Sequence, residues 1–148
     1  MTFMGYRRKE GRAGTRNYVG LLSTVVCANE VAEGIATRVA GTVPFLHHQG
    51  CCQTPVDIAR VNSVLTGLGR NPNLASVILV SLGCESTDVE GVARTIAASG
   101  KDVKTIVIQE IGGAGRSVAE GALLAQEMVR QASVQQRTSC RASDIVLG

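Results

Sequence analysis

The sequence has no tryptophan, few aromatic residues and no long apolar run. Aromatic residues make up 3% of its 148 residues, and no apolar run approaches the roughly 18–20 residues that a membrane-spanning helix needs. The first residues, MTFMGYRRKE, lack the apolar core of a signal peptide. The net charge of +3 is too small to indicate nucleic-acid binding. We therefore expect a cytoplasmic protein that has neither a membrane nor a nucleic acid among its partners.

The composition that is present indicates one folded domain in a reducing compartment. Hydrophobic residues make up 45% of the chain and there are 17 glycines, a profile typical of a compact α/β domain. The five cysteines are odd in number, cluster around turns and are never spaced as CxxC. They are therefore expected to be thiols or metal ligands in the cytosol rather than a disulfide framework.

Four apolar runs alternate with helix-like patterns along the chain. The predicted strands are residues 18–26, 42–46, 76–82 and 103–108. This alternation predicts an α/β fold with an open, mainly parallel four-stranded sheet and helices on both faces, flavodoxin/Rossmann-like. Pro44 places the second strand at a sheet edge, because proline cannot donate to a ladder. Right-handed crossovers then bring the turns after all four strands to one edge, where ligands of such sheets bind.

Helix starts and segment boundaries follow from capping residues and composition. Asn29 and Thr54 are predicted N-caps, and Thr87 with Glu90 and Ser117 with Glu120 are predicted capping boxes. We expect an irregular basic segment at 1–16, the α/β domain at 17–134, and at 135–148 a linker and the start of a further catalytic domain.

Basic residues gather near the N-terminus and face a single acid, Glu10. They are Arg7, Arg8, Lys9, Arg12 and Arg16. This group is either an ordinary surface patch or a cationic lip for an anionic substrate.

Cysteines follow three of the predicted strands. Cys27, Cys51 and Cys84 stand at these ends, with His47 and Cys52 nearby. Thiolate and imidazole suit iron or zinc, so a metal site is one interpretation. A nucleophilic cysteine–histidine pair is a second. Small buried residues that fill tight turns are a third.

His47 and Glu85 are the candidate acid–base groups. His47 and His48 are the only imidazoles and lie beside the Gly-Cys-Cys turn, which favours a role for one of them as ligand or acid–base group. Glu85 follows Cys84 and is either a general base or the first acid of a helix. The GGAGRS loop lacks GxGxxG spacing, so no nucleotide cofactor is expected.

Several motifs in a fixed order resemble the altronate/galactarate dehydratase family. They are GYRRKEGRAGTRNYV, the cysteine after the first strand, HHQGCCQ and RNPNLASVILVSLGCE. The resemblance runs from Phe3 to the C-terminus, and residues 144–148 look like the lead-in to that family's CGGSD-type segment.

This resemblance implies the large catalytic subunit of a carbon–oxygen lyase (hydro-lyase). The implied reaction is β-elimination of water from a hydroxylated sugar acid to a 2-keto-3-deoxy acid, assisted by Fe²⁺ or another divalent metal. A relative, sulfolactate sulfo-lyase, expels sulfite and leaves pyruvate, and its large subunit is the first alternative. A non-catalytic dimerisation domain of such an enzyme is the second.

Site residues and partners also follow from the resemblance. The expected catalytic residues are His47, Cys51 and Glu85, the expected metal ligands are Cys27, Cys51 and Cys84, and the expected substrate-binding residues are Arg16, Asn17, Asn71 and Asn73. The expected partners are a small anionic hydroxy-acid substrate, a small β-rich subunit and a second copy of the chain.

Overall fold

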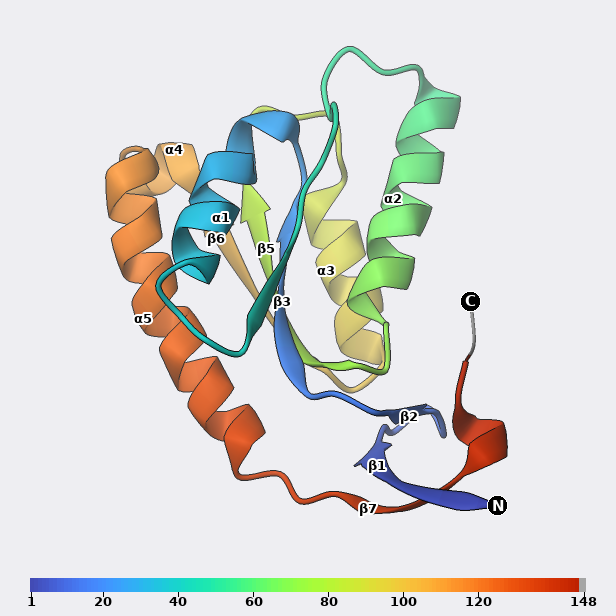
Figure 1. Ribbon diagram of the computed structural model, residues 1–148. Helices are drawn as coiled ribbons and strands as arrows, with labels where there is room; N and C mark the ends of the chain where they lie inside the picture. The colour runs from blue at the N-terminus through green and yellow to red at the C-terminus, as the bar shows by residue number, and fades with distance from the viewer. Residues whose placement is uncertain (147–148) are drawn as a thin grey trace.

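A four-stranded parallel sheet forms the centre of the molecule (Figure 1), which is a computed structural model that describes residues 1–146. The strand order is β4-β3-β5-β6. The strands are β3 (Tyr18–Ser23), β4 (Thr42–Phe45), β5 (Leu74–Ser81) and β6 (Asp102–Val107). The helices are α1 (Asn29–Ala36), α2 (Pro55–Gly69), α3 (Val89–Ala98), α4 (Ile108–Ile111) and α5 (Ala114–Ser133). The predicted fold class is confirmed.

Helices cover both faces of this sheet, as Figure 1 shows. One core cluster joins Leu21 and Ile78 to residues of α1 and α5, and the other joins Leu22 and Leu79 to residues of α2 and α3. Successive residues of a strand point to opposite faces, so Leu21 and Leu22 serve different clusters. This double burial explains why β3 and β5 are continuously apolar in the sequence.

Pro44 lies on an edge strand, as predicted. The amide of Val19 in β3 donates to the carbonyl of Gly41 at 3.0 Å. Every second residue of β4, counted from Gly41, hydrogen-bonds to β3. Pro44 lies between two such residues, so its nitrogen faces away from β3. Proline therefore removes a donor only from the free edge of β4, where the loss breaks no ladder bond.

The first strand and its helix differ from the predicted boundaries. β3 ends at Ser23 rather than at residue 26, and a 3-10 turn over Val26–Ala28 leads into α1. Asn29 does not cap α1, whose N-cap is Ala28. The Asn29 side chain instead donates to the His47 carbonyl at 2.8 Å and accepts from the His47 amide at 2.9 Å. A tertiary contact has taken the side chain that local sequence assigns to a cap.

Of the other predicted caps, only Thr54 is confirmed, with its hydroxyl accepting from the Asp57 amide. Asp88 caps α3 by accepting from the Gly91 amide at 2.9 Å, while the Thr87 hydroxyl donates to the Thr24 carbonyl at 3.0 Å. α5 begins at Ala114 with Gly113 as its N-cap, so Ser117 lies inside the helix. Both predicted capping boxes are wrong.

The expectation of irregular backbone at residues 1–16 is also wrong, and the segment predicted as a linker contains a strand. β1 (Thr2–Arg7) pairs antiparallel with β2 (Ala13–Gly14) and with β7 (Thr138–Arg141), and a 3-10 turn follows over Ala142–Asp144. This small sheet lies below the amino ends of the parallel strands in Figure 1. Pairing between residues more than 130 positions apart, such as Thr2 with Arg141, has no local sequence signature. The last residues of the predicted apolar lead-in, 147–148, lie outside the described part of the chain.

Hydrogen bonds fasten the small sheet to the turn before β5. The Asn73 side-chain oxygen accepts from the amides of Thr15 at 2.8 Å and Arg16 at 3.0 Å. The guanidinium of Arg8 donates to the Pro72 carbonyl at 2.8 Å. A Cβ on Gly14 would lie 2.1 Å from that carbonyl oxygen, so only glycine allows the approach.

Within residues 1–146, no helix combines the length and the hydropathy that crossing a bilayer requires.

Asn73→Ala is expected to lower the free energy of unfolding by about 2 kcal/mol, because two backbone amides lose their acceptor. Urea unfolding followed by circular dichroism measures this. Asn62→Ala is the matched control, since Asn62 accepts one amide, that of Asp88, at 3.3 Å. Equal effects of the two substitutions would contradict the role given to Asn73.

Candidate active site

The turns that follow β3, β4 and β5 meet at the carboxyl edge of the parallel sheet. The chain passes from β3 to β4 on one side and then to β5 on the other, so the strand order reverses between β3 and β5. Backbone bonds join the turns there: Val26 N donates to Gln49 O at 2.7 Å and Ser86 N donates to Gly50 O at 3.2 Å. The predicted convergence is confirmed, at the place where open α/β sheets bind ligands.

The Gly50–Cys52 turn has a backbone that few other residues would tolerate. Gly50 has φ +101°, and a Cβ there would lie 2.6 Å from the Cα of Val25. Cys52 has φ 56°, in the left-handed region that non-glycine residues seldom adopt. Cys51 is consequently half-buried against the core of α1 and α5, whereas Cys52 is exposed.

Cys51 lies within a group of acidic and thiol side chains. Burial raises the pKa of Cys51 above its usual value, and the neighbouring side chains of Cys27, Cys84, Cys52 and Glu85 raise it further. Cys51 is therefore a protonated thiol at neutral pH. This state does not favour the interpretation of Cys51 as an activated nucleophile, which needs a lowered pKa.

The cysteine side chains at this edge do not by themselves form a metal site. Within the described residues, no three histidine, cysteine, aspartate or glutamate side chains are arranged to hold a metal ion. Iron binding by Cys27, Cys51 and Cys84 stays a prediction. The arrangement of these residues in this chain does not fit a metal site.

Glu85 links the ends of β3 and β5. Its carboxylate accepts from the Thr24 hydroxyl, from Leu82 N at 3.3 Å and from Gly83 N at 2.8 Å. Burial alone raises the pKa of Glu85, but bonds from the Thr24 and Ser81 side chains and from backbone amides outweigh it and hold the pKa below its usual value. Glu85 is thus ionised at neutral pH, and several hydrogen bonds already engage its carboxylate.

His47 is a buried, neutral imidazole. The Gln49 amide donates to its Nδ1 at 3.0 Å, so the ring proton must be on Nε2. The ring stacks on His48 with centroids 5.3 Å apart. Burial, and then the charge of His48, lower the pKa of His47. His47 can donate a hydrogen bond from Nε2, but that nitrogen cannot act as a base in this tautomer.

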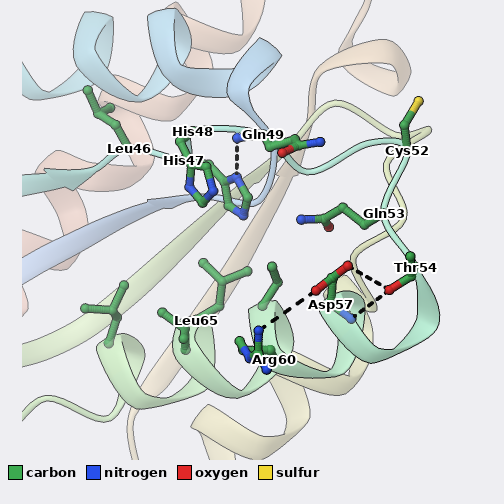
Figure 2. Close-up of a pocket in the computed structure, with 13 residues that line it drawn as sticks. Leu46, His47, His48, Gln49, Cys52, Gln53, Thr54, Asp57, Arg60 and Leu65 are labelled. Atoms are coloured by element: carbon green, nitrogen blue, oxygen red, sulfur yellow. Dashed lines mark hydrogen bonds and ion pairs between the residues drawn. The ribbon is translucent and has the colours of Figure 1, made fainter.

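A groove of about 500 Å³ separates the turn after β4 from α2 (Figure 2). His47, Gln53, Asp57 and Arg60 line its polar part. Leu46, Val61, Val64, Leu65 and Leu68 line its apolar part. Cys51 and Glu85 line no part of it, and Glu85 instead borders a second hollow beside α3 and β6. Glu85 acts electrostatically on the Cys51 thiol, whereas the His47 side chain lines a groove that neither of them lines.

The four predicted substrate-binding residues lie at the opposite end of the sheet. Asn17 precedes β3 and Asn73 precedes β5, so both stand at amino ends of strands. Asn17 donates to the Ala132 carbonyl at 2.8 Å, and Asn71 accepts from the Asn73 amide at 2.9 Å. Arg16 stands beside Asn17, away from Cys27, Cys51 and Cys84. Substrate binding by these residues stays a prediction, and within one copy of the chain they share no site with Cys51.

The basic segment also lies at that far end. Arg7 donates to the Ser139 carbonyl at 3.1 Å, and Arg8 donates to the Asn17 side chain at 2.7 Å. These guanidinium groups hold the small sheet together. The segment does not form a cationic lip at the cysteine edge.

Sequence reasoning missed three polar residues at the carboxyl edge. Thr24 binds Glu85, Gln109 donates to the Cys84 sulfur at 3.6 Å, and Gln53 lines the groove. Thr24 and Gln109 each follow a parallel strand closely. That position in the sequence could have identified them as residues of the carboxyl edge. Their partners depend on the tertiary arrangement.

Comparison with known proteins identifies the family. Residues 5–133 match the family described as D-galactarate dehydratase/Altronate hydrolase, second domain.

Similar proteins with a curated function have related names. The chain is 36% identical to the (2R)-sulfolactate sulfo-lyase subunit beta of Chromohalobacter salexigens, over 97% of the chain and 36% of that protein. It is 29% identical to the altronate dehydratase of Bacillus subtilis, over 99% of the chain and 31% of that protein. It is 26% identical to the galactarate dehydratase (L-threo-forming) of Escherichia coli, over 99% of the chain and 32% of that protein. The chain thus spans about a third of the length of these relatives.

Glu85→Gln is expected to lower the free energy of unfolding by about 2 kcal/mol at pH 7, because a neutral amide accepts more weakly from Thr24 and Gly83. The folded pKa of Glu85 is lowered, so its stabilisation is present above the unfolded pKa of about 4.3 and is lost as pH falls through the folded pKa. In urea unfolding measured from pH 7 to acid pH, the difference in free energy of unfolding between the wild type and Glu85→Gln should shrink. Glu110→Gln, at an exposed carboxylate on the same edge, is the control. A difference that stays constant with pH would refute the role of the charge.

Proposed function

Because the chain belongs to the D-galactarate dehydratase/altronate hydrolase family, we propose that it forms part of a lyase acting on a hydroxylated sugar acid. The reaction is β-elimination of water to give a 2-keto-3-deoxy acid. The observation that carries the proposal is the family match over residues 5–133, together with relatives named altronate dehydratase and galactarate dehydratase.

Such an elimination needs two protein groups that act on adjacent carbons of the substrate. One is a base, and the other is a proton donor. The proton beside the carboxylate leaves, the hydroxyl on the next carbon departs as water, and the enol that forms tautomerises to the keto acid. We place this chemistry at Cys51 and Glu85. Glu85, which is ionised, is the proposed base, and the protonated thiol of Cys51 is the proposed donor to the leaving hydroxyl.

The second candidate is the large subunit of a sulfolactate sulfo-lyase, which releases sulfite and pyruvate. It is favoured by the 36% identity, over 97% of the chain, to a protein of that name. In this reaction a carbon–sulfur bond breaks in place of a carbon–oxygen bond, and sulfite leaves without needing a proton.

The assembly proposed for this chain follows the word subunit in that relative's name. We propose a complex with a second, small β-rich subunit and a homodimer of the present chain. A cytoplasmic location fits the five free cysteines. If the chain serves only as a dimerisation module, the complex would keep its activity when Cys51 and Glu85 are replaced.

The native assembly, isolated through a tag on this chain under anaerobic conditions, is expected to convert D-altronate or galactarate to a 2-keto-3-deoxy acid. Keto-acid and sulfite assays run in parallel on D-altronate, galactarate and 3-sulfolactate separate the candidates. Keto acid without sulfite supports the dehydratase. Sulfite and pyruvate from 3-sulfolactate alone would overturn it in favour of the sulfo-lyase.

Cys51→Ser in that assembly is expected to lower kcat by at least about a hundredfold, because a hydroxyl is a far weaker acid than a thiol. Cys140→Ala is the control, since Cys140 lies in β7 at the other end of the molecule. Near-normal turnover by the Cys51 variant would rule out the proposed donor, whichever substrate is used.

A further inference from the structure

The groove between the turn after β4 and α2 contains two polar atoms that have no hydrogen-bond partner among the described residues. His47 is 8% exposed and lines the groove, and no hydrogen bond within residues 1–146 uses its Nε2–H, which is therefore available to a ligand. The Gln53 Oε1 atom is buried and has no donor within the same residues. A buried polar group without a partner is unfavourable, and groups of this kind in native proteins call for an explanation.

The two atoms are complementary in type. His47 offers a donor, and Gln53 offers an acceptor. Asp57 and Arg60 add one charge of each sign to the same part of the groove; their nearest charged atoms are 3.9 Å apart, a loose pair. In Figure 2, Gln53 extends from the turn before α2 toward the histidine rings, and the Asp57 carboxylate on the first turn of α2 lies between Thr54 and Arg60. This part suits a small group that both accepts and donates hydrogen bonds.

The rest of the groove is apolar. Leu65 is buried beneath it, while Leu46 is 50% and Val64 is 56% exposed along its sides. Apolar side chains that remain this open beside a polar end favour a ligand with an apolar body. A sugar acid, which carries a hydroxyl on each carbon of its chain, would leave this surface unmatched.

We propose that the groove binds a small carboxylic acid with a hydrogen-bond donor on the carbon next to the carboxylate and an apolar side chain. The carboxylate accepts from His47 Nε2–H beside Arg60, the donor pairs with Gln53 Oε1, and the side chain packs between Leu46 and Val64. Apolar 2-hydroxy acids and apolar amino acids share this chemistry. The site is additional to the proposed lyase centre, because neither Cys51 nor Glu85 lines the groove.

Calorimetric titration of the chain tests the ligand class. L-leucine and 2-hydroxy-4-methylpentanoate carry the full pattern, 4-methylpentanoate lacks the donor, and glycolate lacks the apolar side chain. At least one of the first two is expected to bind about tenfold more tightly than either acid that lacks a feature. Tighter binding of leucine assigns amino acids as the ligand, and tighter binding of the hydroxy acid assigns hydroxy acids. Equal affinity for all four, or no binding at millimolar concentration, would overturn the proposal.

Two substitutions test the position of the ligand. Gln53→Leu is expected to remove the tenfold preference for the acid that carries the donor, while leaving 4-methylpentanoate binding unchanged. Val64→Ser is expected to weaken binding about fivefold through lost apolar contact. Val56→Ser is its matched control, because Val56 is a 70% exposed valine of the same helix that does not line the groove. Equal weakening by the two valine substitutions, or a preference that survives Gln53→Leu, would place the ligand elsewhere.

Discussion

The pairing of β3 with β5 is the constraint on which the rest of the molecule depends. These two strands are central in the sheet and are buried on both faces, so their register fixes the positions of both core clusters. It also brings two turns that are about sixty residues apart into contact. Thr24 follows β3 and Glu85 follows β5, and their side chains meet only because Ser23 lies opposite Val80. A one-residue slip would turn every side chain of β3 to the opposite face.

Electrostatics at the carboxyl edge follow from this contact. Hydrogen bonds from Thr24, Ser81 and backbone amides keep Glu85 ionised, while burial, with a smaller contribution from the Glu85 charge, raises the pKa of the neighbouring Cys51 thiol. One side chain therefore remains charged and another remains protonated within a single cluster. A low pKa beside a high pKa is the usual arrangement of paired acid and base groups, which is why the lyase proposal rests on these two residues.

The sequence-based predictions failed mainly where one side chain had two possible partners. Asn29 and Thr87 both have the residue type and position of an N-cap, yet each bonds to backbone across the fold instead. His47 and Glu85 were grouped because both follow strands, yet their side chains face different hollows on either side of the turns. Asn73 resembled a substrate ligand, and in the structure it accepts two backbone amides.

The sequence alone determined the α/β class, the parallel sheet, the edge position of Pro44, the convergence of the cysteine turns and the family, because hydrophobic periodicity and short motifs are local properties. The tertiary structure alone decided which of the converging residues touch. It joined the ends of the chain in a small antiparallel sheet and separated Asn17 and Asn73 from Cys27, Cys51 and Cys84 by the length of the β-strands. It also formed the groove that holds His47 and Gln53. These features depend on pairing across many residues of chain, and that pairing is set by the packing of the whole domain rather than by any local pattern.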